Sequence, residues 1–488
     1  MAQSDGGVGS ERLALATPPP FSDAERSASP SRGGISPHDI VRSGLCIGCG
    51  GCVAGQPGAR MEWDRYGQLK PHGPAEWYSG RTEAFAGTCP FSPAAANEDE
   101  IASARFAVPA AQDEKIGSFE AAYVGHVAEG RFRMNGSSGG LVSWVAAELL
   151  RTGKVDAIAH VIPVDPEKEG RFFRYTVSRN LDALNAGAKS RYYPIELSGI
   201  VREIRAEPGR YAVVGVPCFI KAIHLLRRAD PILEQRITHT LGLFCGHMKS
   251  ARLVDSFAAQ LGQEMANVRA VDYRIKDPGR PANWYRAHLT LASGDTASED
   301  WWHLADGDWG AGFFQNSACN WCDDVVAETA DIAFGDAWVE PHSSDGRGTN
   351  VTVVRSPELH LMVEGARADG RLALEPVSAE YIIQTQAAGF RHRREGLAYR
   401  LTWPKRGIRP IKRVVPSAGN LPLRRRLVYR SRAWIAWWSH LVFAASKALH
   451  KPRLYTGWAR LSLRAYQGLA WSHGRFGQLC DRLERRFS

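Results

Sequence analysis

Residues 121–164, AAYVGHVAEGRFRMNGSSGGLVSWVAAELLRTGKVDAIAHVIPV, decide the fold. The first seven residues are typical of a β-strand, and residues 155–164 are typical of a second one. Between them a loop ends in the turn Asn135-Gly-Ser-Ser-Gly-Gly140, and an apolar helical pattern follows over 141–150. Strand, turn, helix and strand in this order predict an α/β fold.

The Gly/Ser turn is the first candidate for a binding site. A turn that opens a helix presents backbone amides and hydroxyls to an anion, with the helix dipole adding to the attraction. A phosphate or pyrophosphate is the natural ligand of such a turn. Because similar turns equally often serve only to reverse the chain, the motif alone leaves both interpretations open.

Three cysteines lie close together ahead of this unit. The segment Cys46-Ile-Gly-Cys-Gly-Gly-Cys52 has C-x2-C-x2-C spacing, and Thr88-Cys89-Pro90 adds a fourth thiol before a proline. Thiolates at this spacing on a glycine-rich loop are able to converge on one face of a cubane cluster. Structural zinc sites prefer two separated C-x2-C pairs. The spacing therefore favours a 4Fe-4S cluster with the ligands Cys46, Cys49, Cys52 and Cys89.

Four further cysteines are dispersed along the chain. Cys218 and Cys245 each follow a strand-like apolar run, and Cys319 and Cys322 form one C-x2-C pair. Because ligands converge at strand ends of an α/β sheet, these four thiols are able to meet at a second metal site. A single C-x2-C pair fits zinc or a redox disulfide equally well, and an isolated cysteine is often a small buried apolar residue. Spacing alone leaves these alternatives open and assigns no role to Cys480.

Charge is distributed unevenly along the 488 residues. Residues 400–488 hold 20 Lys and Arg against two acidic residues, a net charge of +18, whereas the rest of the chain holds 41 basic and 49 acidic residues. The same tail contains Trp434, Trp437 and Trp438 in a predicted amphipathic helix. We expect it to bind an anionic membrane surface or an acidic partner, with inward-packed tryptophans and a solvated charged face as the alternative. No nucleic-acid-binding motif accompanies the charge, so no nucleic-acid partner is expected.

Composition sets the remaining limits. With 44% hydrophobic and 23% charged residues, the chain is predicted to be folded and to form more than one domain. Residues 1–37 are rich in Ser, Gly and Pro and lack the apolar stretch of an export signal, which predicts a disordered leader. No apolar run is long enough to span a bilayer. Together with the clustered cysteines, this predicts a cytoplasmic protein that the tail is able to hold at the inner face of the membrane.

Taken in order, these motifs resemble the coenzyme F-420 hydrogenase/dehydrogenase beta-subunit family, which includes the plant-type 7-hydroxymethyl chlorophyll a reductases. The resemblance covers roughly residues 46–354. This sequence departs from the family pattern at one motif: where the family frequently has Cys-His-Gly, this chain has Cys245-Gly-His247. The motifs that carry the resemblance are Ser137-Ser-Gly-Gly140, Ser190-Arg191-Tyr192, Val214-Gly-Val-Pro-Cys218, Cys319-x2-Cys322, Ala330-Asp-Ile332 and Gly335-Asp336.

The resemblance implies an FAD-dependent oxidoreductase. It implies a second 4Fe-4S cluster, held by Cys218, Cys245, Cys319 and Cys322. It also implies a set of residues at the flavin: Ser137, Ser138, Gly139, Gly140, Ser190, Arg191 and Tyr192. Lys189 and Arg191 would supply positive charge to the flavin, with a solvated surface position as the alternative for either.

This combination predicts the course of the electrons. We expect a ferredoxin-like donor to deliver them at the Cys46 set, and a small organic substrate to receive them from the flavin. One alternative is an electron-transfer subunit of a larger redox complex without its own substrate. Another is a zinc-stabilised binding protein. The predicted organisation is a leader (1–37), a ferredoxin-type 4Fe-4S module (38–100), two halves of an α/β flavin-binding body (115–205 and 206–399, the latter with the second cluster) and a basic aromatic helical tail (400–488).

Overall fold

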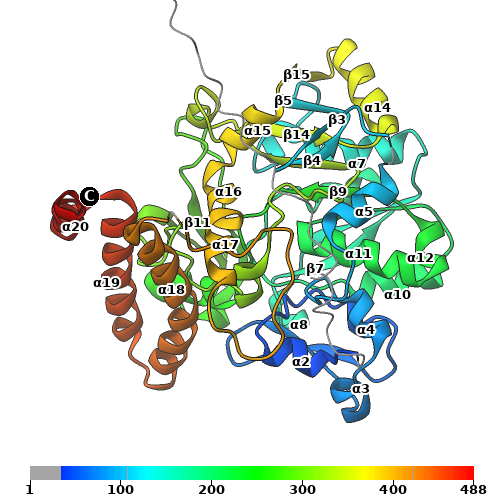
Figure 1. Ribbon diagram of the computed structural model, residues 1–488. Helices are drawn as coiled ribbons and strands as arrows, with labels where there is room; N and C mark the ends of the chain where they lie inside the picture. Colours follow the sequence, from blue (N-terminus) through cyan, green and yellow to red (C-terminus); the bar gives the residue numbers. More distant parts are fainter. Residues whose placement is uncertain (1–33, 107, 420, 488) are drawn as a thin grey trace, which may run out of the picture. The chain divides into compact units, whose positions relative to one another are not determined.

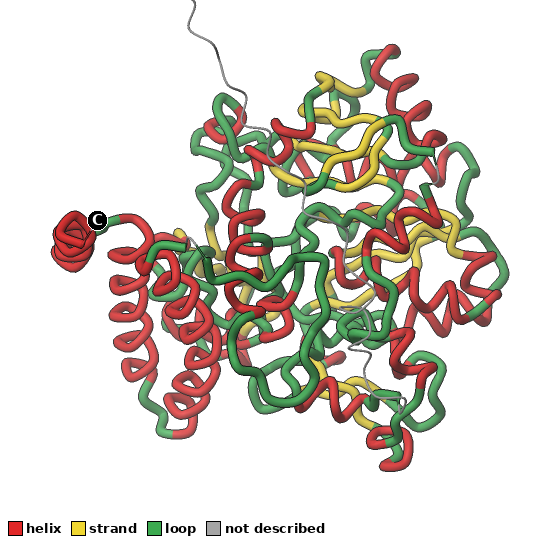
Figure 2. The backbone as a smooth tube through the Cα atoms, in the orientation of Figure 1, coloured by secondary structure: helices red, strands yellow, loops and turns green. Residues whose placement is uncertain are grey.

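The computed structural model describes residues 34–106, 108–419 and 421–487, with side chains up to residue 482. The predicted leader therefore falls almost entirely outside the described residues. Figure 1 shows helices packed around a large sheet. In Figure 2, which colours helices red and strands yellow, the C-terminal part is helical. The α/β fold predicted from the sequence is confirmed.

An eight-stranded mixed sheet forms the centre of the fold. Its four central strands, β13, β9, β8 and β6, run parallel to one another, and all other neighbouring pairs in the sheet are antiparallel. The strands in spatial order are β15 (Leu372–Pro376), β5 (Ala121–Val127), β14 (Asn350–Val354), β13 (Ile332–Asp336), β9 (Ile237–Leu243), β8 (Tyr211–Gly215), β6 (Ala157–Pro163) and β7 (Phe173–Ser178).

The two edge strands, β7 and β15, were not predicted from the sequence. Both carry charged or exposed residues in an otherwise apolar pattern, as strands open to solvent on one side do. A separate three-stranded antiparallel sheet, β10 to β12, lies in the second half of the chain. It consists of β10 (Val268–Asp272), β11 (Arg286–Leu291) and β12 (Thr296–Asp300).

Helices follow the parallel strands in the order that the α/β pattern predicts. Strand β8 is buried along most of its length, and Pro217 then occupies the first turn of the next helix, where its missing N–H costs nothing. The helices between β5 and β13 are α6 (Phe132–Asn135), α7 (Leu141–Arg151), α8 (Pro166–Glu169), α9 (Leu181–Asn185), α10 (Ser198–Ala206), α11 (Pro217–Ala229), α12 (Pro231–Arg236) and α13 (Arg252–Gln260).

The N-terminal part consists of short elements joined by long loops. Strands β1 and β2 form one antiparallel pair, and β3 and β4 form another. Whether this part is a ferredoxin-type module stays a prediction. Its elements are α2 (Pro37–Arg42), β1 (Arg60–Trp63), β2 (Leu69–His72), α3 (Ala75–Ser79), α4 (Glu83–Thr88), α5 (Glu98–Arg105), β3 (Ala111–Asp113) and β4 (Gly117–Phe119).

The C-terminal part is helical, as predicted for the tail. Helices α18 and α19 lie side by side (Figure 1), and Ile435, Phe443 and Tyr455 from them enter the same apolar core as Phe257 and Phe314. The tail is therefore packed onto the body along one face. The helices are α14 (Pro357–Ala368), α15 (Ala379–Thr385), α16 (Ala387–Arg393), α17 (Glu395–Leu401), α18 (Leu423–Ala448), α19 (Pro452–Trp471) and α20 (Gly474–Phe487). No helix in the described part of the chain combines the length and the apolar character that a bilayer crossing needs.

Candidate metal centres and flavin site

The first cysteine set lies on two loops of the N-terminal part. Cys46, Cys49 and Cys52 follow α2 on a loop in which Gly48 and Gly50 adopt left-handed φ values of 84° and 77°. These values favour glycine and let the loop curl, so that its thiols are able to face one point. The fourth cysteine, Cys89, is the residue directly after α4.

Electrostatics place these four thiols together. Burial raises the pKa of Cys49, and the Cys89 and Cys46 thiols raise it further. Burial likewise raises the pKa of Cys52, followed by the effects of the other three thiols of the set. Thiols that disfavour each other's ionisation in this way are close neighbours, and such a set loses its repulsion when it binds a cationic centre.

The second set forms at the carboxyl ends of two parallel strands. Cys218 lies in the first turn of α11 after β8, and Cys245 follows β9. Cys319 lies in a 3₁₀ turn (Ser317–Trp321) that Cys322 ends. Burial raises the pKa of Cys218, followed by the thiols of Cys245, Cys322 and Cys319. The chain thus brings together four thiols that are separated by up to 104 positions between Cys218 and Cys322.

The distances between the cysteine sulfurs bear on the choice between a single zinc ion and a 4Fe-4S cluster. A tetrahedral zinc ion with bonds of about 2.3 Å holds its sulfurs roughly 3.8 Å apart. Within the described residues, no three cysteine sulfurs lie within 4.8 Å of one another; the one group that meets this limit is Glu299, Asp300 and His303. Both cysteine sets are therefore wider than a single zinc ion requires, whereas a cubane of four irons needs such a wider set.

The two sets share one apolar core. Cys46, Cys49, Cys89, Cys218 and the Cys319–Cys322 pair all pack in the same hydrophobic cluster. The thiol of Cys49 also contributes to raising the pKa of Cys218. Centres held by the two sets would therefore be neighbours across this apolar core. Cys480 lies on α20 and belongs to neither set.

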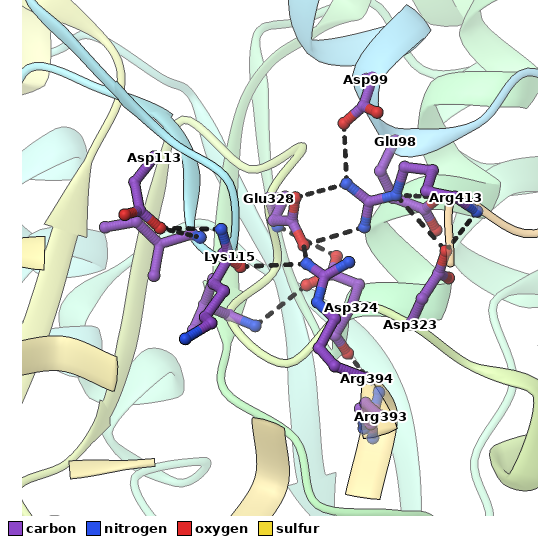
Figure 3. Close-up of polar contacts among 12 residues, drawn as sticks. Glu98, Asp99, Asp113, Lys115, Asp323, Asp324, Glu328, Arg393, Arg394 and Arg413 are labelled. Carbon is purple, nitrogen blue, oxygen red and sulfur yellow. Dashed lines mark hydrogen bonds and ion pairs between the residues drawn. The ribbon is translucent and has the colours of Figure 1, made fainter. Parts of the chain in front are cut away.

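Buried ion pairs surround the loop that follows Cys322 (Figure 3). Arg413 contacts Asp323 (3.4 Å from Nε to Oδ2), Glu328 (2.6 Å from Nη1 to Oε2) and Asp99 (2.8 Å from Nη1 to Oδ1). Arg394 joins the same network through Glu328, at 3.2 Å. This network holds the loop directly after Cys322 through Asp323 and Glu328.

The Gly/Ser turn meets the Ser190 segment, as the resemblance implies. The backbone N–H of Ser190 donates to Ser137 Oγ at 2.9 Å, and Ser138 Oγ donates to the carbonyl of Thr349 at 2.9 Å. The glycines serve packing: a Cβ on Gly139 would lie 2.8 Å from backbone and side-chain atoms of Asn350. Asn350 Oδ1 also accepts from the N–H of Leu141 at 3.1 Å. The first amide of α7 is thus already bonded within the protein, and the anion-binding capacity of the turn rests on its other groups.

Positive charge gathers around this turn. Lys276 donates to the carbonyls of Arg133 and Ser138, at 2.7 Å for the second. Burial, then Arg274 and Arg133, lowers the pKa of Lys276 to about 8. Arg191 Nε is a buried donor without a hydrogen-bond partner in the described residues. An orphaned guanidinium donor beside a basic turn fits the phosphates of a flavin. Lys189 instead pairs with Asp272.

Aromatic side chains connect the turn region with the second cysteine set. The Tyr192 and Trp309 rings are 4.7 Å apart, and Trp309 stacks on His247 at 4.3 Å. A Cβ on Gly246, next to Cys245, would lie 2.5 Å from Trp309 Nε1. The candidate flavin residues therefore adjoin the second set.

Two basic residues near the candidate sites could not be predicted from the sequence. Lys276 contacts the Gly/Ser turn from more than 130 positions away. Arg393 contacts Cys322 from more than 70 positions away. No sequence motif connects either residue with its partner. Asp331 of the Ala330-Asp-Ile332 motif has a structural contact: its Oδ2 accepts from the Thr240 N–H at 2.7 Å, and so ties β13 to β9.

Two sequence models of one protein family match the chain. The sequence model for the N-terminal part of the coenzyme F420 hydrogenase/dehydrogenase beta subunit matches residues 122–202, and the model for its C terminus matches residues 209–380. A chain of the F420-reducing [NiFe] hydrogenase complex from Methanosarcina barkeri, solved as a xenon derivative, is similar at 16% identity and a TM-score of 0.45, over 59% of this chain and 94% of that one. No curated protein matches the chain.

Proposed function

Because the chain belongs to the coenzyme F420 hydrogenase/dehydrogenase beta-subunit family, we propose that it is an iron–sulfur flavoprotein oxidoreductase with two 4Fe-4S clusters and FAD. The family implies redox activity; the cofactors are our proposal. The observation that carries it is the gathering of eight free cysteines into two sets of four, six of these cysteines in one apolar core, with no three sulfurs of the described residues within 4.8 Å of one another.

In this proposal the residues of the chain divide the work. Cys46, Cys49, Cys52 and Cys89 would hold one cluster, and Cys218, Cys245, Cys319 and Cys322 the other. Ser137, Ser138, Ser190, Arg191 and Lys276 would bind the phosphates of FAD, while Tyr192 lies toward the second cysteine set. When bound, clusters carry single electrons and a flavin delivers them in pairs.

We propose a ferredoxin-like donor as the source of electrons and a small organic compound as their acceptor. The order of the centres supports this direction, because the Cys46 set lies in the N-terminal part and the second set adjoins the candidate flavin residues. The alternative is a subunit that passes electrons to a partner protein and has no substrate of its own. Reduction of an organic acceptor by the isolated protein with reduced ferredoxin would separate the two.

Metal and flavin analysis after anaerobic purification tests the proposal. We expect about eight iron and eight sulfide per chain, one FAD, and broad visible absorption that dithionite bleaches. A colourless protein with stoichiometric zinc would refute it in favour of a zinc-stabilised binding protein. Iron for only one cluster would refute the second centre.

The outer face of the tail supports a second partner, an anionic membrane surface. Trp434, Trp437 and Trp438 are 47%, 61% and 40% exposed, although α18 packs on the body through its opposite face. With Leu427 and Arg430 they line an open groove of about 580 Å³. Interfacial tryptophans beside a segment with a net charge of +18 complement anionic lipid. We therefore favour a cytoplasmic protein that binds the membrane peripherally.

A further inference from the structure

In the described part of the chain, two buried arginines next to the second cysteine set, Arg393 and Arg400, form no ion pair with a carboxylate. Arg393 is 2% exposed, and its hydrogen bonds in the described residues go to a thiol and to backbone carbonyls. Arg400, 1% exposed, likewise bonds to the carbonyl of Asn320 at 2.7 Å and to the carbonyl of His392 at 2.8 Å. A buried guanidinium without an anionic partner is costly, so the anion that compensates it should lie at this site.

Arg393 joins the two loops that carry the second set. Its Nη1 lies 2.6 Å from Cys322 Sγ, and its Nη2 donates to the carbonyl of Gly246, next to Cys245, at 2.8 Å. The guanidinium charge therefore lies directly against a sulfur that would ligate the second centre.

Among the described residues, no cation hydrogen-bonds a sulfur of the first set. Lys70 donates to the backbone carbonyl of Cys46 at 2.8 Å, and so contacts no sulfur. Lys221 lies near Cys89 but is paired with Glu98 at 3.1 Å, which neutralises its charge. The two sets thus differ in the charge around them, although they share one apolar core.

We propose that Arg393 is a positioning residue that raises the reduction potential of the centre held by Cys218, Cys245, Cys319 and Cys322 above that of the Cys46 set. The inference rests on the proposed function. A cation that hydrogen-bonds a ligating sulfur stabilises the more negative, reduced cluster. Electrons arriving at the first set would then move to the second, beside the candidate flavin residues. Arg393 lies on α16, beyond the residues that the family models match. We therefore propose this role for Arg393 in this chain and not for the family as a whole.

The test compares three variants. Arg393→Gln removes the charge, Arg393→Lys keeps the charge but loses the two-pronged donor, and Arg391→Gln removes a charge from the exposed side of the same helix. We would measure iron and sulfide per chain, then follow a redox titration by electron paramagnetic resonance. We expect Arg393→Gln to lower the potential of one centre and leave the other unchanged. Arg393→Lys should give a smaller shift of the same sign, and Arg391→Gln none.

Each outcome decides a separate point. Unchanged potentials in an Arg393 variant that retains wild-type iron would overturn the role of Arg393 and leave the proposed function intact. If the Gln variant loses iron, the Lys variant carries the same test. Wild-type protein with iron for one cluster only would instead overturn the second centre itself, before any variant is compared.

Discussion

Lys412 and Asp323 form a buried ion pair next to Cys322, with 3.1 Å between Nζ and Oδ1 and side chains that are 7% and 1% exposed. Asp323 also accepts from the backbone N–H of Arg413. Residues of the basic tail thus form part of the wall of the second cysteine set. Removing the whole tail would expose this site, so point variants test its outer surface more cleanly than a truncation does.

Arg413 should be among the largest single contributors to stability in this region. Its side chain is 9% exposed and faces Glu98, Asp323 and Glu328 (Figure 3). Arg413→Gln removes a positive charge that pairs with these buried carboxylates, so we expect the free energy of unfolding to fall by about 3–5 kcal/mol. Denaturant unfolding measures this change. Arg406→Gln, at an exposed position of the same loop, should change it by less than about 0.5 kcal/mol; equal effects would contradict the prediction.

Cysteine substitutions test the two ligand sets separately. Cys49→Ala and Cys218→Ala should each lower iron by about half, since each set would hold four of eight irons. The two variants should lose different spectroscopic signals. Cys480→Ala, outside both sets, is the matched control and should retain all iron. Full iron in either ligand variant would rule out that set as a cluster site.

Arg191 should govern flavin affinity. Its buried Nε has no partner in the described residues, and a flavin phosphate would supply one. Arg191→Gln removes a charge-assisted hydrogen bond, so we expect FAD to bind roughly tenfold or more weakly to the deflavinated protein. Fluorescence titration with FAD measures the affinity. Arg131→Gln, exposed in the loop before the turn, should leave it unchanged. Gly139→Val is a poorer test, because its side chain would collide with Asn350.

His160 should make the fold sensitive to acid. It is buried on β6 with Nε2 2.7 Å from Ser178 Oγ, and burial lowers its pKa from 6.5 to about 4. As the pH falls, His160 binds a proton in the unfolded chain before it does so in the folded chain. Its contribution to the free energy of unfolding is therefore fully present above pH 6.5 and is lost between pH 6.5 and about pH 4, by about 1.4 kcal/mol for each pH unit. His160→Gln should flatten the pH dependence of thermal unfolding over this interval. Exposed His72→Gln should not; the same slope in both variants would exclude His160 as a source.

The tryptophans of α18 should bind lipid. Changing Trp434, Trp437 and Trp438 to Ser should remove most sedimentation with vesicles that contain phosphatidylserine, while iron content stays as in the wild type, since these side chains lie outside both cysteine sets. Salt should weaken wild-type binding by screening the basic charge. The matched control is Leu461→Ser, at an exposed apolar position of α19 outside the groove. Undiminished sedimentation of the triple variant would contradict the membrane proposal.

Elements that depend on the local sequence pattern could be predicted from the sequence. The strand, turn and helix of residues 121–164 follow from periodicity, and the positions of Cys218 and Cys245 after strands follow from the parallel sheet. Contacts between distant segments could not be predicted. Arg393, Arg400 and Lys412 come from helices and loops that carry no motif, and only the folded chain brings them to the cysteines. The Gly/Ser turn was interpreted as presenting amides and hydroxyls to an anion, or as only reversing the chain; the close packing of Gly139 against Asn350 of β14 could not be predicted from the sequence.

The apolar core shared by both cysteine sets bears on how the protein is made. Cys319 and Cys322 are buried, and Phe219, Ile223 and Leu197 in the same cluster are fully enclosed. Iron and sulfide for the second set would then have to reach Cys319 and Cys322 while this part of the chain is still open, because both thiols are buried in the folded chain. Maturation and the last stage of folding would then be a single event, and the cell's assembly machinery would meet this chain while it is still open.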